Sequence, residues 1–156
     1  MAEGPILLVE DDPSDFRLIQ RAFSKLPIEL KVIRLSNGDE AVAYLAGDAP
    51  YDNRGSHPMP SMVLLDIKLP RRSGFEVLEW LRRQRSALKR LPVVMLTSSR
   101  HSVDINRAYD LGANSYLAKP DSASALENLA SRFQEYWLTL NEPPDLHGSA
   151  AALAPR

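Results

Sequence analysis

The chain has 156 residues, of which 19 are Lys or Arg and 20 are Asp or Glu, so its net charge is close to zero. This length fits one domain with its own hydrophobic core, and the lack of cysteine excludes disulfides, thiolate metal sites and cysteine nucleophiles. Without a basic excess we expect no nucleic-acid and no membrane partner. The amino terminus has no basic region, and the apolar run that follows it, residues 6–9, is short. We therefore expect a soluble, cytoplasmic protein.

The first predicted element is a buried strand. Residues 6–9 form a continuous apolar run, and the acids Glu10, Asp11 and Asp12 follow it directly. Asp12 before Pro13 is typical of a helix start, with Asp as the N-cap and Pro at the first helical position. This cap accounts for Asp12 and leaves Glu10 and Asp11 without a structural role.

The next segment predicts an edge strand, a short helix and a long loop. Apolar and charged residues alternate over residues 30–35, which is typical of a strand near the edge of a sheet. A turn then leads into a short helix. Residues 47–60 contain three prolines and two glycines, so we expect a surface loop to which we assign no chemistry.

A second acidic strand end lies at Asp66. Residues 62–65 are consecutive apolar residues, which predicts a strand buried on both faces of a parallel sheet. Asp66 follows them, before a loop closed by Pro70 and Gly74. In open α/β sheets, ligands bind in the crevice beyond the carboxyl ends of the strands. Taken alone, Asp66 fits a plain turn residue equally well.

The second half continues the alternation of helices and strands. Predicted helices begin near residues 74, 102 and 123, and predicted strands cover residues 92–96 and 114–118. Thr97 follows the first of these strands, and Lys119 with Pro120 closes the second. A residue before proline is pushed out of helical geometry, so Lys119 should lie at a sharp strand end. We expect one domain over residues 5–140 and a disordered tail over residues 141–156.

Five strands alternating with five helices predict an α/β fold with a doubly wound, five-stranded parallel sheet. The strand ends should then bring together Glu10, Asp11, Asp66, Thr97 and Lys119. Two carboxylates about 4 Å apart repel by about 4 kcal/mol at an effective dielectric near 20. Lys119 offsets one charge, and an all-oxygen site suits Mg²⁺ for the rest. Such a site is equipped for phosphoryl transfer onto Asp66.

At this point the sequence resembles the response-regulator receiver domains of two-component signalling, over roughly residues 5–140. The resemblance implies a flavodoxin-like receiver fold with strand order 2-1-3-4-5, in which Asp66 accepts phosphate from a histidine kinase. It rests on these residues as a set: Glu10, Asp11, Asp66, Pro70, Gly74, Thr97, Lys119 and Pro120.

The resemblance also implies a metal-binding arrangement. Asp11, Asp66 and the backbone carbonyl of Lys68 would be direct Mg²⁺ ligands, and Glu10 would act through water. Lys119 would pair with a phosphoryl oxygen.

A conformational switch is implied as well. Thr97 and Tyr116 would form the switch pair, in which the hydroxyl moves toward the phosphate and the aromatic ring follows inward. By resemblance we also expect a cis peptide bond between Lys119 and Pro120.

The chain looks like a stand-alone receiver, similar to the small regulators paired with bacterial phytochromes. Its expected partner is therefore a sensor histidine kinase, such as a bacterial phytochrome. We expect no enzymatic activity beyond its own phosphorylation and dephosphorylation. A homodimer is expected through the fourth helix, fifth strand and fifth helix, with Tyr109 and Tyr136 contributing exposed aromatic surface.

Three other classes of protein share parts of this pattern. A haloacid-dehalogenase-type phosphatase needs a second Asp two residues after the nucleophile, where this chain has Lys68. A flavodoxin-like cofactor binder needs a loop rich in hydrogen-bond donors after the first strand, where this chain has acids. The remaining alternative is a non-phosphorylated interaction module on the same fold.

Overall fold

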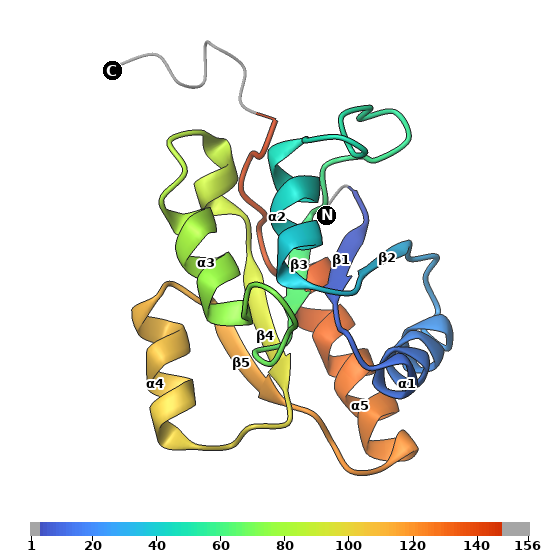
Figure 1. Ribbon diagram of the computed structural model, residues 1–156. Coiled ribbons are helices and arrows are strands. Elements are labelled where there is room, and N and C mark those ends of the chain that lie inside the picture. The colour runs from blue at the N-terminus through green and yellow to red at the C-terminus, as the bar shows by residue number, and fades with distance from the viewer. Residues whose placement is uncertain (1–3, 148–156) are drawn as a thin grey trace.

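The structure, a computed structural model, describes residues 4–147. Strands and helices alternate along the chain (Figure 1). The strands are β1 (Ile6–Val9), β2 (Val32–Leu35), β3 (Met62–Leu65), β4 (Val93–Thr97) and β5 (Ser115–Ala118). The helices are α1 (Pro13–Ser24), α2 (Gly38–Ala46), α3 (Gly74–Arg82), α4 (Ser102–Asp110) and α5 (Ala123–Phe133). A 3-10 turn, η1 (Ala87–Arg90), precedes β4, and a π-helical segment, η2 (Gln134–Leu140), extends α5.

The strands form one parallel sheet in the order β2-β1-β3-β4-β5, which confirms the predicted doubly wound receiver fold. Helices cover both faces: α2, α3 and α4 pack on one side, and α1 with α5 on the other (Figure 1). Because all strands are parallel, their carboxyl ends lie along one edge of the sheet. The acidic residues after β1 and β3 therefore come to the same edge.

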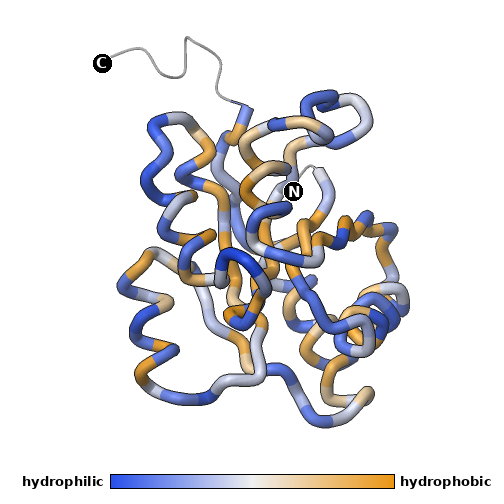
Figure 2. The backbone as a smooth tube through the Cα atoms, in the orientation of Figure 1, coloured by the Kyte–Doolittle hydropathy of each residue, from blue (hydrophilic) through white to orange (hydrophobic). Residues whose placement is uncertain are grey.

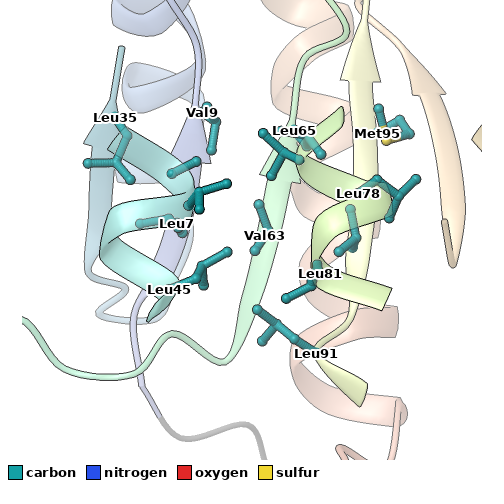
Figure 3. Packing of buried hydrophobic residues seen from close by; sticks show 14 of the residues in the cluster. Leu7, Val9, Leu35, Leu45, Val63, Leu65, Leu78, Leu81, Leu91 and Met95 are labelled. Atoms are coloured by element: carbon teal, nitrogen blue, oxygen red, sulfur yellow. The ribbon is translucent and has the colours of Figure 1, made fainter. Parts of the chain in front are cut away.

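The hydrophobic core has two layers, one on each face of the sheet. Side chains from β1, β3 and β4 contact α2 and α3 in one layer, to which Leu7, Val63 and Leu78 belong (Figure 3). The second layer joins the other face to α1 and α5, with Phe23 and Phe133 in edge-to-face contact. Hydrophobic residues run continuously along the central strands and intermittently along the helices (Figure 2). This pattern is what burial on both faces requires.

The end of the described chain returns to the domain. Residues 141–147 lie at the edge of the sheet opposite the strand carboxyl ends (Figure 1). Leu146 packs against the core layer that contains Leu91, and Arg90 donates a 2.7 Å hydrogen bond to the carbonyl of Asp145. The expected disordered tail thus begins with residues that contact the domain, and its residues 148–156 lie outside the described part of the chain. Over residues 4–147, no helix combines the length and apolar character that a membrane span needs.

Candidate functional site

The acids after β1 have separate environments. Glu10 is 1% exposed, and its backbone N–H donates to Leu35 on β2. Asp11 is exposed to solvent. Asp12 accepts hydrogen bonds from the backbone N–H groups of Ser14 and Asp15, so it is the N-cap of α1. The predicted cap is confirmed, and it leaves Glu10 and Asp11 available for the site.

Asp66 is held at the end of β3 by its backbone and its side chain. It is 7% exposed, its N–H donates to the carbonyl of Val9 at 3.2 Å, and its Oδ1 accepts from Ile67 N at 2.7 Å. The loop returns at Gly74, which begins α3 and donates to the carbonyl of Ile67. A Cβ atom on Gly74 would lie 2.0 Å from the Asp66 carbonyl oxygen, so this close approach requires glycine.

Lys119 joins the strand ends. Its ammonium group contacts Oε1 of Glu10, and it lies 2.9 Å from Oδ2 of Asp66. A third carboxylate, Asp15 on α1, also contacts it at 2.9 Å. The Lys119 side chain is 12% exposed and those of Glu10 and Asp66 are buried, so these two contacts are screened little by solvent, whereas Asp15 is 39% exposed and its contact is screened more.

Burial and charge shift two of these groups. Burial raises the pKa of Glu10 to about 7, although the hydrogen bond from Lys119 opposes the shift. Burial lowers the pKa of Lys119, but hydrogen bonds to Glu10, Asp15 and Asp66 outweigh that effect, and the net pKa lies above its usual value. Lys119 therefore stays charged, whereas Glu10 titrates near neutral pH.

The site has an excess of negative charge. Carboxylate oxygens of Glu10, Asp11 and Asp66 all lie within 4.8 Å of one another. Three carboxylates, those of Glu10, Asp15 and Asp66, contact the single ammonium group of Lys119, and Asp11 adds a fourth acid to the site. Such hard oxygen donors are the ligands that Mg²⁺ prefers, and the exposed Asp11 leaves room for retained water. The residues present therefore fit a divalent cation.

The hydroxyl and aromatic candidates lie on the neighbouring strands. Thr97 is 1% exposed at the end of β4, and its carbonyl accepts from the backbone N–H of Lys119. Tyr116 on β5 is half-buried, and its hydroxyl donates to the carbonyl of Ser99 at 2.8 Å. Ser99 in turn donates to Asp104 at 2.6 Å. The loop after β4 is thus attached to both β5 and α4.

One expected feature of the site is wrong, and another stays a prediction. The cis bond expected before Pro120 is wrong: among the described residues, the cis peptide bond joins Ala49 and Pro50. An X-Pro bond favours trans by about 0.5–1 kcal/mol, and the contacts of Lys119 are made from that isomer. Lys68 lies two residues after Asp66 with an exposed side chain, and the ligand role of its carbonyl remains a prediction.

Comparisons with known proteins settle the family. The family model for the response regulator receiver domain matches residues 6–131. The chain belongs to this family. The receiver domain carries its acidic pocket here as Glu10, Asp11 and Asp66.

Two curated relatives of this receiver are regulatory proteins of similar length. The probable methanogenesis regulatory protein FilR2 of Methanothrix harundinacea is 41% identical, with 92% of this chain and 90% of that protein covered. The response regulator Rcp1 of Synechocystis is 38% identical, with 85% and 88% covered. The chain thus spans nearly the full length of both relatives.

Solved structures agree with the fold and the family. The phosphorylated cyanobacterial phytochrome response regulator RcpA has a TM-score of 0.84 at 37% identity and covers 92% of this chain and 100% of its own. The Mn(2+)-bound form of response regulator Rcp1 has a TM-score of 0.82 at 35% identity, with the same coverage. Receiver domains bind such cations in their acidic pocket, and this chain retains three carboxylates there.

Sequence reasoning missed two residues of the site. Asp15 contacts Lys119 from the first turn of α1, where an acid is usually attributed to the helix dipole. Arg34 on β2 donates to the backbone carbonyls of Glu10 and Asp11, and its guanidinium lies 4.8 Å from the Phe16 ring centroid. In the sequence, Arg34 fits the charged face of an edge strand. Nothing in the spacing distinguishes these roles from ordinary solvation.

Proposed function

We propose that this protein is a single-domain response regulator that accepts a phosphoryl group on Asp66 from a sensor histidine kinase in an Mg²⁺-dependent reaction. The observation that carries the proposal is the placement of Asp66. Its buried carboxylate contacts the ammonium group of Lys119 and belongs, with Glu10 and Asp11, to an acidic cluster suited to a divalent cation. The membership of the chain in the receiver family supports the same function.

The chemistry divides between the residues of the site. A carboxylate oxygen of Asp66 forms the new bond to phosphorus while the phosphorus–nitrogen bond of the phosphohistidine breaks, and its electron pair stays on the imidazole. Glu10, Asp11 and Asp66, with the carbonyl of Lys68, would hold Mg²⁺, which supplies charge stabilisation for the transferring group. Lys119 would neutralise the charge that develops on a phosphoryl oxygen.

The same site has a route to the protein surface. Thr97 is buried, its backbone carbonyl accepts from the N–H of Lys119, and the Tyr116 hydroxyl donates to the loop that follows Thr97. Movement of the Thr97 hydroxyl toward the phosphoryl group would change that loop and with it the surface of α4 and β5. We infer that Thr97 and Tyr116 form the switch and that this surface binds partners, including a second copy of the chain.

The kinase is proposed from the relatives. RcpA is a phytochrome response regulator, and the present chain is 37% identical to it over nearly the whole length. We therefore propose a bacterial phytochrome as the kinase that phosphorylates Asp66.

The decisive experiment measures intact mass after incubation with acetyl phosphate and Mg²⁺. Wild type should gain one phosphate, and peptide mapping should place it within residues 62–74. Asp66→Asn keeps the shape of the side chain and removes the nucleophile, so it should fold and gain none. Phosphate on another segment, or in Asp66→Asn, would overturn the proposal, and a folded wild type that gains none from acetyl phosphate or a cognate kinase would favour the non-phosphorylated module.

A further inference from the structure

The ammonium group of Lys119 has all three of its hydrogen-bond donors occupied. A lysine ammonium carries three N–H donors and no acceptor. The three acceptors are the carboxylates of Glu10, Asp15 and Asp66. Glu10 and Asp66 belong to the acidic cluster, whereas Asp15 lies outside it. Asp15 therefore serves Lys119 without being a member of the proposed metal site.

The position of Asp15 on α1 suggests a specific task. Asp12 already caps the helix, and within residues 4–147 the Asp15 carboxylate has Lys119 as its one side-chain partner. A cavity of about 30 Å³ lies beside the pair, lined by Asp15, Lys119 and Leu18 among others. This volume is enough to hold one water molecule. Without the Asp15 carboxylate, the ammonium group has space to turn away from Asp66.

We propose that Asp15 is a positioning residue of the phosphorylation site: with Glu10 it holds the Lys119 ammonium group so that the third N–H points at Asp66 and at the phosphoryl group accepted there. This inference rests on the proposed function. It assigns to Asp15 an effect on the rate of phosphorylation that acts through Lys119 and requires no contact with phosphate or metal.

The reaction explains why two fixed contacts are needed. When an Asp66 oxygen bonds to the phosphorus of acetyl phosphate, the phosphorus–oxygen bond breaks and its electron pair leaves with acetate. Asp66 becomes a neutral acyl group and loses its attraction for Lys119, while the phosphoryl oxygens carry the charge. The N–H that pointed at Asp66 then donates to a phosphoryl oxygen, and the bonds to Glu10 and Asp15 stay in place.

The test compares two variants that remove the same charge from the same helical turn. Asp15→Asn weakens the contact with Lys119, whereas Asp12→Asn keeps a good N-cap and touches no lysine. At saturating Mg²⁺, the rate of mass gain from acetyl phosphate should fall about three- to tenfold in Asp15→Asn, as expected for one hydrogen-bonded ion pair whose carboxylate is 39% exposed. In Asp12→Asn it should stay within about twofold of wild type. Asp15→Glu should recover part of the rate.

A second readout is independent of phosphorylation. Nitrogen-detected NMR of the lysine ammonium groups should show a slowly exchanging Lys119 signal in wild type and Asp12→Asn, and faster exchange with water in Asp15→Asn. A Lys119 signal that is unchanged in Asp15→Asn, or as fast as solvated lysines in wild type, overturns the inference. A rate in Asp15→Asn equal to that of Asp12→Asn overturns it as well. Should wild type take no phosphate, the proposed function fails and the Lys119 signal alone decides on Asp15.

Discussion

At the scale of single residues, Glu10 is the described acid whose pKa changes most when the chain folds. Its side chain is buried, and burial raises its pKa to about 7. A raised pKa means that the folded, metal-free protein holds the proton more tightly than the unfolded chain does. A bound cation favours the ionised form instead. Protons and metal therefore compete at this position close to physiological pH.

This competition predicts a pH-dependent affinity for Mg²⁺. Below pH 7 the proton on Glu10 must leave before the cation binds, so affinity should rise between pH 6 and pH 8, by up to about tenfold per unit below the pKa. Isothermal titration at three pH values measures it. Glu10→Gln removes the titrating group and should flatten the dependence. An equally steep dependence in Glu10→Gln would assign the proton to another group.

At the scale of secondary-structure elements, the start of α3 fits tightly against the end of β3. Replacing Gly74 with Ala would place a Cβ atom 2.0 Å from the Asp66 carbonyl oxygen, so backbone must move. We expect Gly74→Ala to lower the free energy of unfolding by about 3 kcal/mol, as overpacking against backbone does. Urea denaturation measures this loss.

Gly55→Ala is the matched control, because the nearest atom to its added Cβ is the side-chain oxygen of Asn53 at 3.1 Å. That oxygen belongs to a side chain that can shift, so the control should change stability by less than about 1 kcal/mol. Equal losses in the two variants would show that the approach of α3 to Asp66 has no special cost.

Local sequence patterns predicted the strands and helices well, because a buried strand or helix needs particular residue types at neighbouring positions in the chain. The apolar run at residues 62–65 became a fully buried central strand, and Asp12 with Pro13 became the start of α1. The contact of Asp15 with Lys119 produces no local sequence pattern, because the two residues are 104 positions apart. Likewise, the return of residues 141–147 depends on a surface that only the folded domain presents.

At the scale of the whole molecule, residues 141–147 pack against the domain near the amino ends of the strands. Leu146 is half-buried against the core, whereas Leu140 is 70% exposed. Leu146→Ala should therefore lower the free energy of unfolding by about 1–2 kcal/mol, and Leu140→Ala should leave it nearly unchanged. Thermal or urea unfolding of the two variants tests this. Equal stability would mean that residues 141–147 do not contribute to the fold in solution.

Exposed apolar side chains lie on α4 and on η2, the segment that extends α5. Tyr109 is 49% exposed, Tyr136 is 52% exposed and Val103 is 74% exposed. The strand β5 lies at the edge of the sheet, so one of its sides has no neighbouring strand. Exposed aromatic groups next to an open strand edge favour a protein interface. Large apolar groups also occur singly on monomers, so the interface needs a direct test.

We predict that two copies of the chain associate through this surface, with Tyr109 and Tyr136 at the contact. Light scattering at micromolar concentration should give twice the mass of one chain. Tyr136→Ser should shift the mass toward the monomer, whereas Leu18→Ser, which removes a 49% exposed group from α1, should not. Beryllofluoride with Mg²⁺, which mimics the phosphoryl group on Asp66, shows whether the switch controls association, because Tyr116 would carry the change to β5. A monomer mass with and without beryllofluoride would rule the dimer out.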